Sequence, residues 1–144
     1  MGAAEEAVVA RFMEAWGDGT QEEPDVETIV SMFAEDVVWQ LWVPGGPELR
    51  GIEAIRTDIV RQLTFSRFMR CGPIHIASAG GVVFTEREDT FVSNGETVHH
   101  HLVAVFEVNA DGLISAWREY FDPGDVNRQL KEARDRARAA AAQE

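Results

Sequence analysis

Residues 82–121 read VVFTEREDTFVSNGETVHHHLVAVFEVNADGLISAWREYF, and the fold class follows from this stretch. Three of its segments are rich in the β-branched and aromatic residues that favour strands, and they cover residues 82–92, 97–108 and 113–121. Asn94-Gly95 lies between the first two segments, and Asn-Gly is the strongest short signal for a two-residue hairpin turn. A second turn, Asn-Ala-Asp-Gly, occupies residues 109–112. The stretch therefore predicts two consecutive antiparallel hairpins.

Helices dominate the part of the chain that precedes these hairpins. Apolar residues recur at helical spacing over residues 8–16, 26–33 and 52–63. Strands are predicted at 37–43 and 74–77, and a charged, Ala-rich helix at about 126–142, with Asp125 as its N-cap. Because the helices cluster early and the strands pair antiparallel, the sequence predicts an α+β fold, in a single domain that spans residues 1–144.

The turn at Asn94-Gly95 sets which residues face each other across the first hairpin. If these two residues form the turn, Asp89 lies opposite His100 and Arg87 lies opposite Leu102. Residues two apart on a strand share a face, so Arg87 and Asp89 both point to the apolar side of the sheet. Burying an ion pair there is costly unless it finds further partners.

A partner for Arg87 is available on the last strand of the stretch. Either two-residue turn within residues 109–112 puts Glu119 on the same face as Leu102 and Ala104. Glu119 is then two strands from Arg87, roughly 10 Å from backbone to backbone, since neighbouring strands lie ~4.8 Å apart. Long arginine and glutamate side chains can close that gap. The sequence therefore predicts Asp89, Arg87 and Glu119 in line.

Two carboxyls held apart by one guanidinium suit concerted acid/base chemistry. Burial raises the pKa of a carboxyl and a neighbouring arginine lowers it, so the two acids can hold different protonation states at neutral pH. One could then donate a proton while the other accepts one. The alternative is a buried ion-pair network that only stabilises the sheet. Spacing alone favours neither interpretation.

Composition and charge exclude several classes of protein. The chain is 45% hydrophobic and 26% charged, which is typical of a soluble globular domain and not of a disordered chain. No apolar stretch reaches the ~18 residues of a membrane span, and the acidic N-terminus lacks the apolar region of a signal peptide, so we expect a cytoplasmic protein. The net charge of -12 argues against binding to nucleic acid or to anionic membranes.

The sequence predicts neither a metal site nor a cofactor site. His99, His100 and His101 alternate between the two faces of a strand, so their side chains cannot converge on one ion. Cys71 is the single cysteine and lacks an obvious basic partner, which predicts an inert thiol. The sequence contains no glycine-rich phosphate loop and no nucleophile elbow.

At these residues the chain resembles the limonene-1,2-epoxide hydrolase branch of the SnoaL-like, NTF2-like superfamily. The resemblance runs from about residue 8 to residue 125. The matching segments are Phe33-Ala34-Glu35-Asp36, the helix led by Gly51, residues 83–89, and residues 105–106 through 117–122. The resemblance implies an NTF2-like (cystatin-like) cone, in which a curved mixed sheet wraps on N-terminal helices around a deep apolar pocket. It also implies a homodimer, and the aromatic residues Trp42, Phe84 and Tyr120 would suit an interface on the outer sheet face.

The same resemblance implies a one-step mechanism with no covalent intermediate. Asp89 would be the general acid to the epoxide oxygen, Arg87 the bridge, and Glu119, in place of the family's usual Asp, the base that deprotonates water. The Tyr and Asn that help to hold this water in the family fall at Trp39 and Leu41. Leucine cannot form hydrogen bonds, and an indole only donates them.

We expect a small hydrophobic substrate in the pocket. His100, opposite Asp89, could supply a polar contact in place of those lost at Trp39 and Leu41. The residues predicted to bind the substrate are Trp39, Leu41, Leu63, Phe68, Phe91, His100, Leu102 and Phe121.

Three functions are consistent with this pattern. The first is hydrolysis of a hydrophobic epoxide. The second is an isomerase or cyclase that acts on a terpenoid or polyketide substrate without water, since Trp39 and Leu41 would exclude it. The third is a small-molecule binding module whose buried triad is structural. The triad favours an enzyme over a binding module, and we place the hydrolase first.

Overall fold

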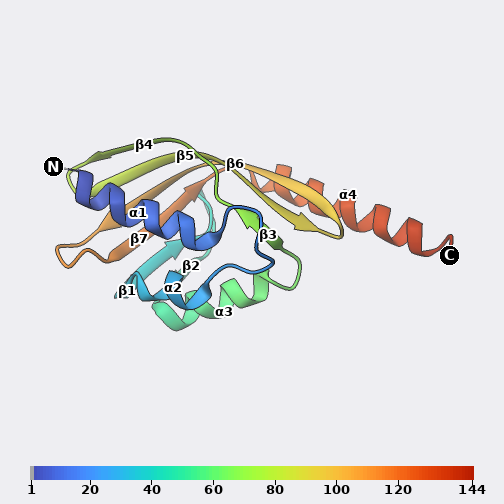
Figure 1. The fold of residues 1–144 in the computed structure, drawn as a ribbon, viewed down its shortest axis with the longest axis horizontal. Helices are drawn as coiled ribbons and strands as arrows, with labels where there is room; N and C mark the ends of the chain where they lie inside the picture. The colour runs from blue at the N-terminus through green and yellow to red at the C-terminus, as the bar shows by residue number, and fades with distance from the viewer. Residues whose placement is uncertain (1) are drawn as a thin grey trace.

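A curved mixed sheet with helices on its concave side forms the body of the protein (Figure 1). The computed structural model describes residues 2–144. The strands are β1 (Phe33–Gln40), β2 (Glu48–Arg50), β3 (Arg67–Arg70), β4 (Pro73–Ala79), β5 (Val82–Ser93), β6 (Glu96–Val108) and β7 (Ile114–Tyr120). The helices are α1 (Ala3–Trp16), α2 (Val26–Ser31), α3 (Ile52–Gln62) and α4 (Pro123–Ala141). The α+β class is confirmed.

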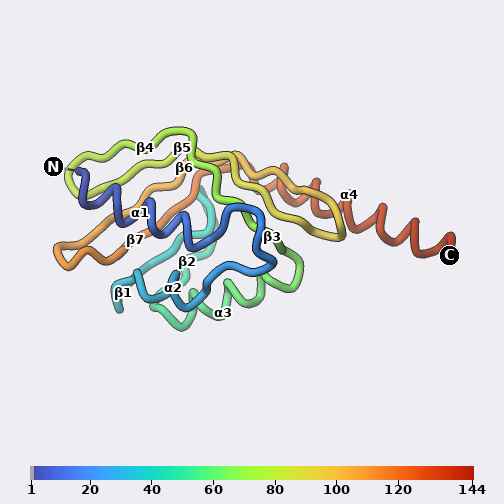
Figure 2. The backbone as a smooth tube through the Cα atoms, viewed as in Figure 1, coloured from blue at the N-terminus to red at the C-terminus, as the bar shows by residue number. Residues whose placement is uncertain are grey.

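The strands are arranged in the order β2-β1-β7-β6-β5-β3, and β4 also pairs with β5. The pairing of β1 with β7 is parallel and all the other pairings are antiparallel, which makes the sheet mixed. The backbone tube in Figure 2 shows β5 and β6 as one long hairpin that extends toward α4. This hairpin is the longest paired unit of the sheet, and it carries the residues that the sequence singles out.

The hairpin register is the one that the sequence predicts. Asp89 pairs with His100 and Arg87 pairs with Leu102 across β5 and β6. Both turn residues, Asn94 and Gly95, have positive φ angles of 51° and 77°, as a type I′ turn requires. On the next pair of strands Ala104 lies opposite Glu119. The prediction that these side chains share one face is therefore confirmed.

The sheet contains short elements that the sequence analysis missed. β2 and β3 have 3 and 4 residues, too few to show an alternating pattern. β1 runs from Phe33 to Gln40 and not from residue 37 to residue 43. A register shift between Phe33 and Val38 breaks the apolar alternation at the start of this strand, which explains the error.

The last helix begins three residues before the predicted start. The side chain of Asp122, and not that of Asp125, caps α4 by accepting a hydrogen bond from the Gly124 N–H at 2.9 Å. Pro123 fits the first turn, where a missing N–H costs nothing. None of the helices in residues 2–144 has the length and apolar character that crossing a bilayer requires.

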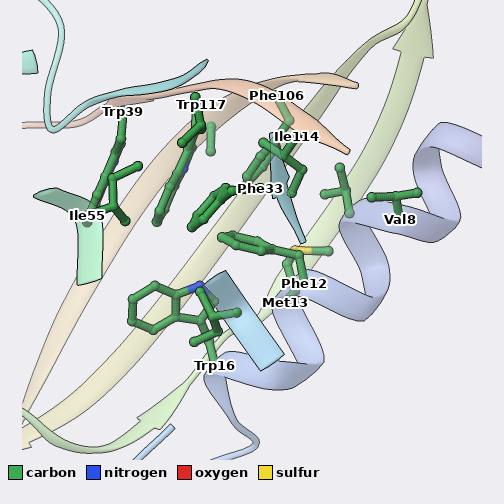
Figure 3. Close-up of a cluster of buried hydrophobic side chains, with 14 of the residues drawn as sticks. Val8, Phe12, Met13, Trp16, Phe33, Trp39, Ile55, Phe106, Ile114 and Trp117 are labelled. Carbon is green, nitrogen blue, oxygen red and sulfur yellow. The ribbon is translucent and has the colours of Figure 1, made fainter. Parts of the chain in front are cut away.

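An aromatic cluster fills the space between α1 and the concave face of the sheet. Figure 3 shows Phe12 and Trp16 reaching from α1 toward Phe33 and Trp117. Phe12 meets Trp117 edge-on, with ring centroids 5.1 Å apart. Trp39 and Trp117 stack face to face at 4.0 Å and 3°, from the neighbouring strands β1 and β7. Aromatic pairs of this kind add about 0.5–1.5 kcal/mol beyond their buried area, so the wall beside Glu119 is rigid.

Two of the three aromatic residues predicted for the outer face of the sheet lie there. Phe84 and Tyr120 are 42% and 41% exposed. Trp42 does not belong with them, because it lies in the loop after β1 and lines the cavity described below. The homodimer stays a prediction.

A side-chain amide joins α4 to the free edge of β6. The amide of Gln129 donates to the His99 carbonyl and accepts from the His99 N–H, both at 2.8 Å. Farther along α4, Ala133 is buried and Arg136 forms an ion pair with Glu96 at the hairpin turn. These contacts hold α4 against the sheet as far as Arg136, while Figure 1 shows its C-terminal end extending away from the body.

Replacing Gln129 with alanine should loosen this attachment. The variant loses both hydrogen bonds to His99 and a third from the amide to Asp125 Oδ2, and it leaves the His99 N–H without its partner. We therefore expect a loss of about 1–2 kcal/mol in the free energy of unfolding. Amide hydrogen exchange at His99 should become faster. Arg128→Ala is the control, since Arg128 pairs only with Asp125 and Glu132 on the exposed side of α4 and should change stability by less than about 0.5 kcal/mol. Equal exchange in the two variants would contradict the anchoring role.

Candidate active site

The centre of the site is a buried arginine between two carboxyl groups. Arg87 Nη2 lies 3.0 Å from Asp89 Oδ2 and 3.4 Å from Glu119 Oε2. Arg87 Nε makes a second contact with Asp89 Oδ1 at 3.2 Å. Arg87 and Glu119 are 4% and 7% exposed. The structure thus brings together the three residues that the sequence places in line.

Two further groups hold the arginine and its first carboxyl partner. Arg87 Nη1 donates to Thr85 Oγ1 at 3.3 Å, and the backbone N–H of Gly72 donates to Asp89 Oδ1 at 3.1 Å. A Cβ atom on Gly72 would lie 2.3 Å from the Glu88 carbonyl oxygen, so only glycine lets this backbone approach β5 so closely. Gly72 therefore supplies a donor that no side-chain pattern in the sequence indicates.

Arg87 stays charged in this setting. Burial lowers its pKa, but the charges of Asp89 and Glu119 outweigh burial and raise the pKa above its ordinary value. The guanidinium is therefore a permanent cation that both carboxyls can share. A group of this kind can stabilise negative charge on either carboxyl while a proton moves.

Glu119 lies in the less polar part of the site. Burial raises its pKa to about 7, against the lowering effect of Arg87, while Asp89 adds to the rise and the Trp39 indole opposes it. The Trp39 Nε1 atom is buried and makes no hydrogen bond within residues 2–144. Glu119 is thus close to half protonated at neutral pH.

The three residues lie on the wall of a cavity of about 250 Å³. The wall also includes five of the residues predicted to bind the substrate, Trp39, Leu41, Phe91, His100 and Phe121. Most of it is apolar, and its polar residues are the triad, His100, and Arg61, Gln62, Ser66, Arg70 and Asn127. Pockets for small ligands commonly have this composition, a hydrophobic wall with a few polar groups at one point.

Three residues predicted to bind the substrate do not reach the cavity. Leu63 continues the buried face of α3 below Ile59, so its side chain packs inside the protein. Phe68 is 41% exposed, and its neighbour Met69 lines the cavity instead. The backbone of Phe68 has a positive φ of 52°, so β3 does not follow regular strand alternation there. Leu102 is 4% exposed and belongs to the hydrophobic core.

Three further parts of the chain line the cavity and were not predicted from the sequence. They are the end of α1, the segment after α3, and α4. Trp16 comes from the end of α1, Phe65 from the segment after α3, and Val126 and Leu130 from α4. The last two are four residues apart and share a helix face, a signal that could have indicated their role. Trp16 follows the same helical spacing as the core residues of α1, which hides its position at the cavity.

His100 is an uncharged ring beside the triad. Burial lowers its pKa to about 4, against the opposing effect of Asp89, so the imidazole is neutral over the range in which most enzymes work. The ring meets Phe121 edge-on at 4.2 Å, and its Nε2 atom has no hydrogen-bond partner within residues 2–144. His100 therefore does not titrate near neutral pH, although the ordinary pKa of histidine would place its titration there.

Cys71 is held as a thiol, and the described residues form no metal site. Burial raises the pKa of the Cys71 thiol above its ordinary value, although Arg87 acts in the opposite direction. Between residues 2 and 144, no three His, Cys, Asp or Glu side chains come together as metal ligands would. Proton transfer by the two carboxyls is the chemistry that this geometry supports directly.

Removing the central charge should destabilise the protein. Arg87→Met leaves two buried carboxyls without their shared cation, and we expect a loss of ~3–5 kcal/mol in the free energy of unfolding at pH 8. The triple variant Arg87→Met/Asp89→Asn/Glu119→Gln removes both charges as well and should recover a large part of this loss. Urea denaturation of the two variants and the wild type measures both effects. A triple variant less stable than Arg87→Met would contradict the electrostatic explanation.

The raised pKa of Glu119 should appear in the pH dependence of stability. A carboxyl whose pKa is higher in the folded than in the unfolded state stabilises the protein at low pH. This contribution is present below about pH 4 and is lost as the pH rises to about 7, on the order of 3 kcal/mol in all. The difference in unfolding free energy between the wild type and Glu119→Gln should fall over that range. A difference that is constant from pH 4 to pH 8 would contradict the raised pKa.

Comparisons with known proteins agree with the fold. A model of the SnoaL-like domain matches residues 9–117. The epoxide hydrolase EphG of Mycobacterium tuberculosis (strain ATCC 25618 / H37Rv) is 30% identical over 118 residues, which cover 82% of this chain and 76% of that protein. The solved structure of an M. tuberculosis LEH-like epoxide hydrolase matches with a TM-score of 0.73 and 26% identity, over 91% of this chain and 92% of that one. This chain therefore belongs to the SnoaL-like domain family, within the NTF2-like superfamily.

Proposed function

We propose that the protein is an epoxide hydrolase that adds water to a hydrophobic epoxide by acid/base catalysis. The observation that carries the proposal is the line Asp89–Arg87–Glu119 on the wall of an otherwise largely apolar cavity. The curated relative and the solved structure are both named as epoxide hydrolases, which supports the same chemistry.

Opening an epoxide needs two proton transfers at once. The oxygen that leaves the carbon must receive a proton, and the water that attacks the carbon must lose one. Two carboxyls on either side of one cation can do both, one as acid and the other as base, and neither forms a bond to the substrate. Arg87 keeps its charge throughout and joins the two carboxyls electrostatically.

The cavity favours a small and mainly hydrophobic substrate. Trp39, Leu41, Phe91 and Phe121 offer apolar surface, and a volume of about 250 Å³ fits a compact molecule. The reacting ring would lie against the triad, since the two carboxyls that transfer protons lie there. Apolar contacts with the rest of the substrate would hold the epoxide in place for the reaction.

A screen of cyclic and terminal epoxides tests the proposal. The wild type should convert at least one of them to the vicinal diol. Asp89→Asn and Glu119→Gln should each lower kcat by ~10²–10⁴-fold or more, because each removes one proton transfer. Glu88→Gln is the matched control, since Glu88 lies on the opposite, exposed face of β5 and should leave kcat unchanged. A rearranged isomer in place of the diol, or full activity in either triad variant, would contradict the proposal.

A further inference from the structure

The two carboxyls of the site differ in their hydrogen bonds. Asp89 accepts three, from Gly72 N–H at 3.1 Å, from Arg87 Nε at 3.2 Å and from Arg87 Nη2 at 3.0 Å. Glu119 accepts one, from Arg87 Nη2 at 3.4 Å. The same arginine therefore binds Asp89 with two nitrogens and Glu119 with one, at the longer distance.

This difference sets which carboxyl carries a proton. A carboxylate that accepts two or three N–H bonds is stabilised in its ionised form, and Asp89 meets that condition. Glu119 has one weak donor and is buried beside the stacked rings of Trp39 and Trp117, an environment that favours the neutral acid. Burial raises the pKa of Glu119 to about 7, in the same direction.

We propose that Glu119 is the general acid and Asp89 the general base, the reverse of the roles that the family resemblance implies. The proposal rests on the proposed epoxide hydrolysis and assigns the direction in which the protons move. It follows from the geometry: Asp89 accepts three hydrogen bonds, while Glu119 accepts one, at Oε2, which leaves its Oε1 to carry a proton.

The reversal also places the attacking water. An ionised carboxyl has about four lone-pair positions, and the donors to Asp89 use three of them. His100 lies directly across the hairpin from Asp89 and lines the cavity, and its Nε2 atom is buried with no partner among residues 2–144. A water that donates to Asp89 could bond with the other ring nitrogen of His100. Glu119 has the Trp39 indole beside it, which can donate to a water but cannot accept its second proton, and Leu41 forms no hydrogen bonds.

The step balances in atoms and charge. The water oxygen forms a bond to one epoxide carbon as the bond from that carbon to the ring oxygen breaks. The electron pair of the broken bond goes to the ring oxygen, which takes the proton of Glu119. One proton of the attacking water passes to Asp89, and the other stays on the new hydroxyl group. The product is a diol, and transfer of the proton from Asp89 back to Glu119 through solvent restores the starting state.

A pH profile cannot separate the two assignments. In both of them the active state has one proton shared between Asp89 and Glu119, so the apparent pKa values of activity belong to the pair. A nucleophile that needs no base does separate them. Azide is such a nucleophile, and it should restore turnover only where the missing carboxyl is the base.

We therefore expect sodium azide to act on one variant and not on the other. In Asp89→Ala, azide should raise turnover at least tenfold and give the azido alcohol, because Glu119 can still protonate the leaving oxygen. In Glu119→Ala, azide should have no such effect. The opposite pattern, or equal rescue of both variants, overturns the proposal. A wild type that forms no diol from any epoxide contradicts the proposed function instead, so the two failures are distinct.

Infrared spectroscopy gives a second test that needs no turnover. The wild type at pH 6 should show the carbonyl band of a protonated carboxyl, and this band should disappear by pH 8. Glu119→Gln should lose the band at every pH. Asp89→Asn should keep it but with a lower pKa, because the Asp89 charge contributes to the raised pKa of Glu119. If azide restores turnover in neither variant, the infrared band decides between the two assignments. A band that is lost in Asp89→Asn and kept in Glu119→Gln overturns the proposal.

His100 acts here as a positioning residue for water. His100→Gln, which can still bond to water, should keep more diol formation than His100→Leu, with the difference in kcat and not in KM. In the Asp89→Ala background, neither substitution should change azido alcohol formation, because no water needs to be held. A loss of azide-dependent turnover with both substitutions would show that His100 serves packing alone.

Discussion

The structure depends on one buried cation and the two carboxyls that neutralise it. Arg87 is 4% exposed, and a guanidinium cannot lose its charge to escape the cost of burial. Its partners come from β5 itself and from β7, with β6 between them. Three strands must therefore pair in a single register before the charges meet. A slip by one residue would turn Arg87 to the outer face and leave Glu119 buried alone.

That register is set at the ends of the strands and is maintained by packing. The turn at Asn94-Gly95 fixes β5 against β6, because both residues adopt positive φ angles that few other pairs accept. Behind Glu119, the rings of Trp39 and Trp117 stack across β1 and β7 and meet Phe12 of α1. The aromatic cluster thus packs the wall of the site and also gives the side of Glu119 an apolar lining. One group of side chains provides both stability and the low polarity that the chemistry uses.

Local rules were sufficient to predict the centre of the site but not its outer walls. The line Asp89–Arg87–Glu119 follows from strand alternation and turn length, both of which can be read from neighbouring residues. The error at Phe68 has the opposite cause, since β3 has 4 residues and shows no pattern that would indicate which of them face inward. The contributions of α1 and α4 were missed because only tertiary packing brings these helices to the cavity. Gly72 was missed because its contact is made by the backbone.

The unusual residues of this site make the two ends of the triad differ in polarity. At the end where Glu119 lies, Trp39 and Leu41 provide no acceptor for a water proton, and the longer Glu119 side chain reaches Arg87 with a single contact of 3.4 Å. At the other end, Gly72 adds a third donor to Asp89 and His100 adds a neutral polar ring across the hairpin. The Glu119 end of the triad is therefore less polar than the Asp89 end. Since water binds where polar groups remain, this difference is the reason for the proposal that the attacking water and the base lie at the Asp89 end, with the acid in the less polar part of the cavity.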